Sequence, residues 1–258
     1  MAEATVVRSG GPTRKRDAAA VAAMWGVISR KRQEQFESMV RQGGVKSIPT
    51  KWWAEVEKEY EDSLRSMLII MLAVAASNLS GGGTPTDDRA VANATYAATR
   101  AKEAAQAMVQ QARNSADDLG RRMADANKAA AAIARATGSQ AVPMQVEITV
   151  VFDEKMAGDI AAYETVAAEG AAVEFTPHNY DKDIWLTTPD ERVCKYCEAL
   201  EGEPRDKWEA IAALHLFPPY LRVRIFRGPP IHPHCWCEVA LDGTTRDGQV
   251  HHNTPRPG

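Results

Sequence analysis

The sequence predicts an α+β fold that is mostly α, in which long N-terminal helices precede a small α+β domain. Residues 13–138 are rich in alanine and other good helix formers, and their large apolar side chains recur at three-to-four spacing. A β-branched run follows at 146–152, and all four cysteines fall within the stretch 194–237. These shifts divide the chain into a flexible arm (1–12), a helical region (13–138), a cysteine-containing domain (144–241) and a disordered tail (242–258).

The first expected helix follows the basic cluster Arg14–Arg16 and ends at Gly43–Gly44, because a pair of glycines terminates a helical pattern. One apolar stripe predicts its buried face. The stripe comprises Val21, Trp25, Ile28, Phe36 and Met39.

The second expected helix starts after Pro49–Thr50 and stops at Gly81–Gly83. It contains the most apolar run of the chain, residues 67–76, which is far shorter than the roughly 20 apolar residues that cross a bilayer. We therefore expect a buried helix and no membrane partner. Its predicted buried face comprises Trp53, Val56, Tyr60, Leu64, Leu68, Met71 and Ala75.

The third expected helix begins at Thr84–Asp87, where a threonine cap precedes a proline and an acid, and runs to about Ala136. Its apolar seam is slender. Small side chains allow close helix approach but bury little area each, so this helix needs a partner, either within the chain or from another subunit. The seam comprises Val91, Ala98, Ala105, Met108, Ala112, Leu119 and Met123.

The amino-acid composition of the chain changes after Gly138 and Pro143. The β-branched run 146–152 predicts a strand, and a helix is expected from 153 to 168, closed by Gly170. Two more short strands are expected at 172–175 and 184–187.

The charge and the N-terminus narrow the class of protein. The formal net charge is -3 and the sequence pI is about 6.1, so no global basic field points to nucleic acid. Residues 1–8 contain no apolar signal core. We therefore expect a reducing compartment, where paired thiols hold metal more often than they form disulfides.

The cysteines form two tight pairs, Cys194-x-x-Cys197 and Cys235-x-Cys237. Two pairs of soft ligands a few tens of residues apart are typical of a closed structural zinc site. His232 is the strongest competitor for the fourth position, and His234 is a further candidate. The alternatives are four buried thiols or two redox pairs, although the flanks lack the βαβ context of a thioredoxin-like motif.

The residues around the cysteines resemble a known family. The chain contains Trp185-Leu-Thr-Thr-Pro-Asp190-Glu-Arg192-Val-Cys194-x-x-Cys197-x-x-Leu200-x-Gly202, followed by Pro229-Pro230-x-His232-Pro233-x-Cys235-x-Cys237. Over roughly residues 145 to 240 this order is similar to the phage Mu F-like head morphogenesis (minor capsid) proteins of tailed bacteriophages.

The resemblance implies a structural protein of the phage head that is not an enzyme. Such a protein acts in head assembly at the portal or inner capsid and affects genome packaging or ejection. Its implied partners are the portal protein and the major capsid protein. Its implied location is the virion, inside the head near the portal, and the host cytoplasm during assembly.

Other residues leave an alternative open, a zinc-containing DNA-binding protein or an HNH-like metal-dependent nuclease. The nuclease would use His178-Asn179 and His232, but no Ser-His-Asp set or phosphate loop is evident. A half-exposed strand with one basic face is expected around 222–227. The side chains available for packaged DNA are Arg14, Lys15, Arg16, Arg222, Arg224 and Arg227.

Two tryptophans are assigned roles. Trp185 is expected to pack under the metal site, since tryptophans in such positions are more often core anchors than ligand stackers. Trp52 and Trp53 cannot both face one side of a helix, so Trp52 is a candidate for exposure to a partner.

Overall fold

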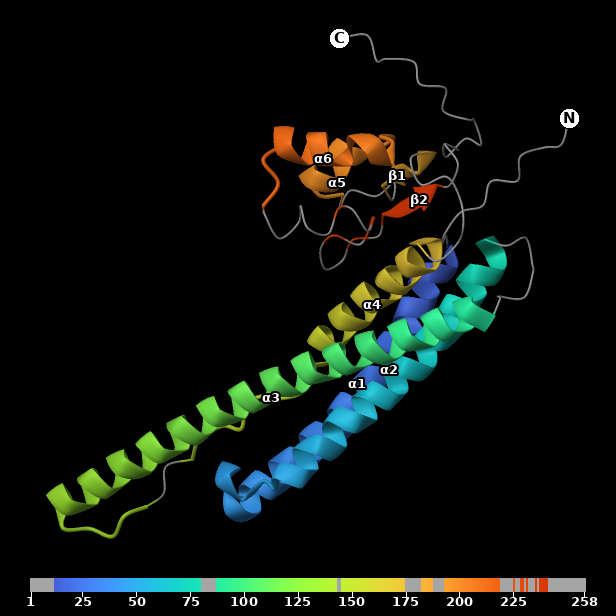
Figure 1. Ribbon diagram of the computed structural model, residues 1–258. Helices are drawn as coiled ribbons and strands as arrows, with labels where there is room; N and C mark the ends of the chain where they lie inside the picture. The colour runs from blue at the N-terminus through green and yellow to red at the C-terminus, as the bar shows by residue number, and fades with distance from the viewer. Residues whose placement is uncertain are drawn as a thin grey trace, which may run out of the picture.

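The computed structural model describes residues 12–79, 87–142, 145–174, 182–187, 193–218, 225, 228–229, 231, 235 and 237–240. It confirms the α+β, mostly α fold class (Figure 1). The elements are α1 (Pro12–Gly43), η1 (Val45–Ser47), α2 (Thr50–Leu79), α3 (Asp87–Thr137), α4 (Glu154–Glu174), β1 (Ile184–Leu186), α5 (Lys195–Leu200), α6 (Arg205–Leu214) and β2 (Glu238–Ala240).

The first two helices are joined by buried aromatic side chains. Trp25 of α1 and Tyr60 of α2 meet edge to face with ring centroids 4.9 Å apart. The indole of Trp25 donates to Ser63 Oγ at 3.0 Å, and the Tyr60 hydroxyl bonds to Ser29 Oγ at 2.8 Å. Burial raises the pKa of Tyr60 to about 12. The interface is thus apolar in bulk, with its polar atoms paired.

The predicted apolar faces of these helices are largely confirmed. Val21, Trp25 and Phe36 of α1 are fully buried, whereas Met39 is half-buried and the adjacent Val40 occupies the core. On α2 every predicted residue is buried except Ala75, which is half-buried.

Two helices end where the glycines predict. Gly44 follows α1 with a φ of 75°, and its N–H donates to Val40 O at 2.8 Å. Gly138 follows α3 with a φ of 67°, and the next residue, Ser139, donates to Ala134 O at 3.1 Å. Glycine adopts this left-handed conformation without the steric penalty of a Cβ, so it closes the last turn and pairs carbonyls that the helix leaves free.

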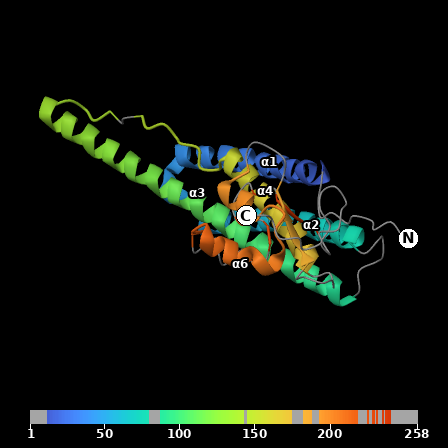
Figure 2. The ribbon, with the colours of Figure 1, turned by 90° about the horizontal axis from the view of Figure 1, so that it is seen from above.

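The long helix α3 has its partner within the chain. It packs mainly along α2 through small residues that include Ala97, Ala101 and Ala105, all fully buried. The predicted seam is correct for Ala105, Met108, Ala112 and Leu119 but wrong for Val91, which is 66% exposed because Asn93 and Ala97 face the neighbouring helices instead. Toward its C-terminus α3 extends beyond the ends of α1 and α2 (Figures 1 and 2).

The predicted strand at 146–152 is wrong. Residues 145–152 run irregularly, because no neighbouring strand takes up their backbone groups in the described part of the chain and a side chain of α1 does so instead. Gln33 Oε1 accepts from the backbone N–H of Val151 at 2.9 Å and of Phe152 at 3.1 Å. Phe152 then packs against Trp53, with ring centroids 6.1 Å apart.

The same cluster restrains Trp52, the candidate for exposure. Its ring lies 4.9 Å from that of Trp53 and 5.9 Å from that of Phe152, and the Arg32 guanidinium lies over it at 5.9 Å. Trp52 is therefore half-buried and engaged within the chain.

Helix α4 is longer than predicted. Asp153 caps its start, since Asp153 Oδ1 accepts from Lys155 N at 2.7 Å. The helix passes through Gly170 to Glu174, so the predicted strand at 172–175 is wrong over residues 172–174, and residue 175 lies outside the described residues. Ala171 and Ala172 are buried in the same core as α1, α2 and α3, and this packing outweighs the glycine.

A bidentate ion pair fixes α4 to α3. Arg100 Nε donates to Glu164 Oε2 at 3.0 Å and its Nη2 to Oε1 at 2.5 Å. The Glu164 side chain is only 4% exposed. Although burial alone lowers the pKa of Arg100, the charge of Glu164 raises it, so the guanidinium stays charged.

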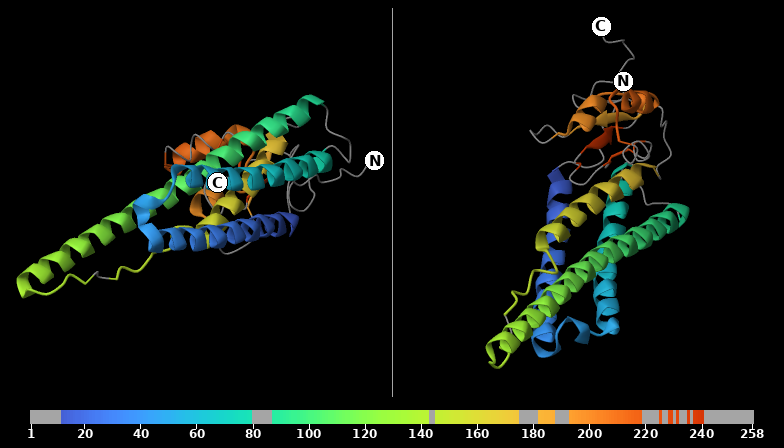
Figure 3. Two further views of the ribbon diagram at one scale, coloured as in Figure 1. Left: turned by 90° about the horizontal axis from the view of Figure 1, so that it is seen from below. Right: turned by 90° about the vertical axis from the view of Figure 1, so that its left-hand side faces the viewer.

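The C-terminal elements form a second, smaller core beside α4 (Figures 1 and 3). The strand predicted at 184–187 is confirmed as β1, which pairs antiparallel with β2 in the register Trp185↔Val239. The buried Asp183 pairs with Arg205 at 3.1 Å, which joins the start of β1 to α6. We call this unit, residues 182–240 as described, the cysteine module.

Gly170 is where the module meets α4. A Cβ at this position would lie 2.5 Å from the backbone oxygen of Pro229, which is closer than real Cβ contacts. Gly170 is thus required by the close approach of two backbones.

Several expectations fall on residues that the structure does not describe. The N-terminal arm is outside it up to residue 11, as are the stop at Gly81–Gly83, the tail at 242–258 and most of the expected basic strand at 222–227. Pro12 is the first residue of α1. Within the described residues, no helix has the length and apolarity to cross a membrane.

The Gly170 contact predicts opposite effects for two glycine-to-alanine changes. Gly120→Ala in α3 should raise stability by about 0.5–1 kcal/mol, because alanine favours the helix and the new Cβ meets Val45 at 3.6 Å, an ordinary contact. Gly170→Ala should lower it by about 1–3 kcal/mol, because the helix gain is smaller than the cost of overpacking. Urea denaturation of both variants measures the difference, and an equal gain in both would contradict the contact.

Candidate metal centre

Two short elements present the cysteines. Cys194 and Cys197 lie at the N-terminus of α5, where Cys194 is the N-cap and its Sγ accepts from Cys197 N at 3.4 Å. Cys237 immediately precedes β2, and Cys235 lies two residues earlier. The pairing of β2 with β1 and the packing of α5 on the same core bring the two ends of the motif together.

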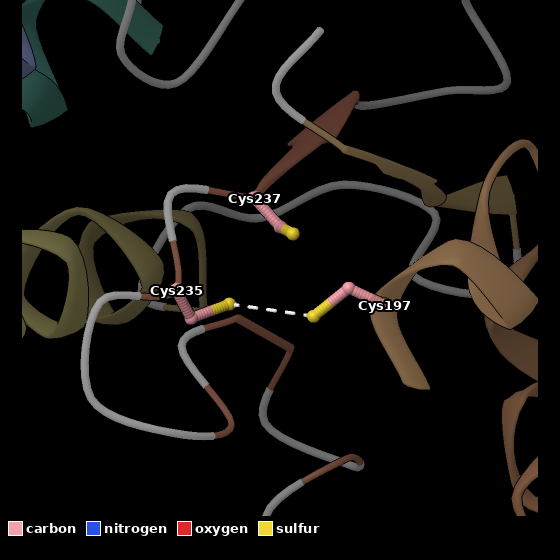
Figure 4. Close-up of side chains that lie close together, drawn as sticks. All are labelled: Cys197, Cys235 and Cys237. Atoms are coloured by element: carbon pink, nitrogen blue, oxygen red, sulfur yellow. Dashed lines mark hydrogen bonds between the residues drawn. The ribbon is translucent and has the colours of Figure 1, made fainter. Parts of the chain in front are cut away.

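Three sulfurs converge in the interior of the module. The Sγ atoms of Cys197, Cys235 and Cys237 all lie within 4.8 Å of one another (Figure 4). The Cys197 and Cys235 sulfurs are 3.7 Å apart. A tetrahedron of thiolates about 2.3 Å from a central ion has edges of about 3.8 Å, so this spacing fits a shared metal ion.

The three thiols are buried, with exposed fractions of 1%, 2% and 4%. All four cysteines are free of disulfides. Trp185, which was expected to pack under the metal site, is fully buried in the same cluster as the three sulfurs. The three sulfurs belong to the same core cluster as Trp185, Trp208 and Ile231, so an ion bound among them would lie in the interior of the module.

The charge distribution among the thiols is uneven. Hydrogen bonds from Cys197 and then Cys237 lower the pKa of Cys235. Hydrogen bonds with Cys194 and the other thiols raise the pKa of Cys197. For Cys237, the bond with Cys197 lowers the pKa, but the bond with Cys235 and burial outweigh it and raise it. The three thiols therefore compete for negative charge, and a bound cation would stabilise the thiolate form of each.

Cys194 stands apart from the other three. Its sulfur does not belong to the group formed by Cys197, Cys235 and Cys237, and the residue is less buried than those three. The same sulfur accepts the hydrogen bond that caps α5. Its contact with Cys197 nevertheless keeps it next to the site. Of the predicted ligands, the structure therefore brings together Cys197, Cys235 and Cys237 and leaves Cys194 at their edge.

The remaining predicted residues are not placed. His232 and His234 lie outside the described residues, as do His178 and Asn179. Of the candidate DNA contacts, Arg14, Lys15 and Arg16 lie at the start of α1, and Arg222, Arg224 and Arg227 lie outside the described residues.

A second feature was not visible in the sequence. A shallow polar hollow lies between α3 and the irregular segment 145–152, where Arg122 donates to Thr149 Oγ1 at 2.9 Å. It joins segments that no motif connects, so only the folded chain reveals it. Its lining residues are Gln111, Asn114, Ser115, Asp118, Arg122, Thr149 and Val150.

Comparison with known proteins adds no assignment. No family model, curated protein or solved structure matches the chain.

The geometry predicts which cysteines carry the metal. Purified full-length chain should contain one tightly bound ion, and Cys197→Ser, Cys235→Ser or Cys237→Ser should each reduce the metal content to near zero, because a neutral hydroxyl replaces a thiolate. Elemental analysis of the purified proteins measures this content.

Two further variants identify the fourth ligand. Cys194→Ser and His232→Ala differ in expected outcome, since the residue that completes the shell should lower metal affinity and the other should not. Full metal content in all three variants of the buried cysteines would show that the cluster is a set of core thiols.

Proposed function

We propose that the cysteine module binds one zinc ion and that the ion is structural. The donor set supports zinc, because buried thiolates at tetrahedral spacing are its usual structural ligands. Catalytic zinc sites keep one position open to water and substrate. Here the three converging cysteines are all buried, which favours a closed site.

The ion's role follows from the size of the second core. Within its described residues, the cysteine module has a two-stranded sheet, two short helices, one main cluster of buried side chains and a second cluster of three, Ile184, Leu186 and Ala240. Such a small core supplies little folding free energy, and a metal commonly compensates. Zinc would link α5 to the start of β2, two segments that are remote in sequence.

We further propose that the protein is a minor phage head protein that acts structurally in head assembly. The observation that carries this proposal is the convergence of Cys197, Cys235 and Cys237, since these residues belong to the motif that resembles the Mu F-like proteins. On this proposal the chain lies in the virion near the portal, after assembly in the host cytoplasm. Its partners are the portal protein and the major capsid protein, and its effects extend to genome packaging or ejection.

The shape of the molecule is compatible with docking. The module sits at one side of an elongated helical bundle, and α3 has a length of about 75 Å at 1.5 Å per residue. Long helices offer extended surface to neighbouring subunits.

Within the described ranges, the cysteine trio is the one group of histidine, cysteine and acidic side chains with metal-ligand spacing. We therefore propose a non-enzymatic role and treat nuclease activity as an outcome of the test.

A structural zinc ion predicts selective unfolding by chelation. Removing zinc from the full chain should abolish the near-ultraviolet circular dichroism of Trp185 and Trp208, since both indoles belong to the module's core. The far-ultraviolet helical signal should be mostly retained, because α1–α4 share a separate core.

Cys235→Ser provides the control and should resemble the chelated wild type without chelator. An unchanged near-ultraviolet spectrum and melting profile after complete zinc removal would refute the structural role.

The head-protein proposal predicts the chain in phage particles. Quantitative mass spectrometry of particles produced by the host that carries this gene should detect it at a few copies for each portal, in both precursors and virions. Its absence from both kinds of particle would refute the proposal. Magnesium-dependent cleavage of plasmid DNA that His232→Ala abolishes would instead favour the nuclease.

A further inference from the structure

The indole N–H of Trp185 is buried without a hydrogen-bond partner. The side chain has no exposed surface, and its Nε1 is among the buried polar atoms that no described group satisfies. Leaving such a donor unpaired loses its hydration without replacing it, so an unpaired donor in a native core needs an explanation. The neighbouring Trp208 offers a contrast, since its Nε1 donates to Glu203 O at 2.8 Å.

Strand register directs Trp185 toward the cysteines. The backbone of Trp185 bonds to Gly202 and Glu203 on one edge of β1, which leaves Trp185↔Val239 as a non-hydrogen-bonded pair with close side chains. Cys237 lies two residues before Val239, so alternation along the extended chain places its side chain on the same face. All three side chains accordingly share one core cluster.

The Trp185 ring packs against the ring of Trp208. It meets Trp208 edge to face, with centroids 5.0 Å apart and an interplanar angle of 87°. Its N–H lies beside the sulfur of Cys237. This contact falls short of the geometry of a full hydrogen bond.

We propose that Trp185 is a positioning residue of the metal centre, whose indole N–H donates to the sulfur of metal-bound Cys237. This inference rests on the proposed metal site. A metal-bound thiolate carries more charge than a thiol and is a better acceptor, so metal binding satisfies the buried donor. Partners of this kind orient the ligands, and their loss typically costs 10–100-fold in metal affinity.

The test compares Trp185→Phe with Trp208→Phe in the cobalt-loaded full chain. Both changes keep an aromatic ring and remove one indole N–H, but only Trp185 faces the thiolate. Trp185→Phe should shift the sulfur-to-cobalt charge-transfer band to lower energy, because the thiolate loses a donor that stabilises its electrons. It should also weaken cobalt binding about 10–100-fold in competition with a chelator.

Trp208→Phe should leave the band position unchanged, even if it lowers the melting temperature. An unchanged band in Trp185→Phe with cobalt bound would overturn the inference while leaving the metal site intact. Failure of the wild-type chain to bind cobalt or zinc would overturn the metal site and this inference with it.

A measurement on the wild-type protein tests the inference even if the Trp185→Phe variant does not fold. With an NMR-active cadmium isotope in the site, the Trp185 indole proton should show scalar coupling to the metal through the N–H···S bond. The Trp208 indole proton should show none, because it donates to a backbone carbonyl. A cadmium-loaded protein with no coupling at Trp185 would overturn the inference.

Discussion

The packing of α4 is the constraint on which both parts of the molecule depend. Its alanines complete the core that α1, α2 and α3 form, and Arg100 holds it to α3 through the buried Glu164. The same helix passes within contact of Pro229 at Gly170, so it also supports the cysteine module. A helix that belongs to one core and abuts another couples the position of the cysteine-bearing segments to the bundle.

The sequence predicted the parts of the fold that large apolar side chains determine. Trp25, Phe36 and Leu64 occupy the core because their spacing matches the helical period and their burial dominates the local energetics. The strand prediction for residues 146–152 was wrong for a physical reason. A β-branched run indicates an extended chain but not its partner, and here the partner is Gln33, more than a hundred residues away. The strand prediction for residues 172–174 was wrong because the tertiary packing of alanines overrode the helix end that Gly170 indicated.

The candidate site was predictable to a similar degree. Paired cysteine spacing anticipated the convergence of Cys197 with Cys235 and Cys237, because short turns force paired sulfurs to one side. It did not predict that Cys194 would cap α5 at the edge of the cluster. The sequence also identified Trp185 as a core anchor. That its ring nitrogen lacks a partner is a matter of ring orientation, which no spacing rule encodes.

The contact between Gly170 and Pro229 has a thermodynamic consequence. Most interfaces between folded units immobilise side chains, and each immobilised long side chain loses up to about 2 kcal/mol of rotamer entropy. At this point the module meets α4 through a glycine backbone and a carbonyl oxygen, neither of which has rotamers to lose. This part of the junction is therefore ordered at little entropic cost.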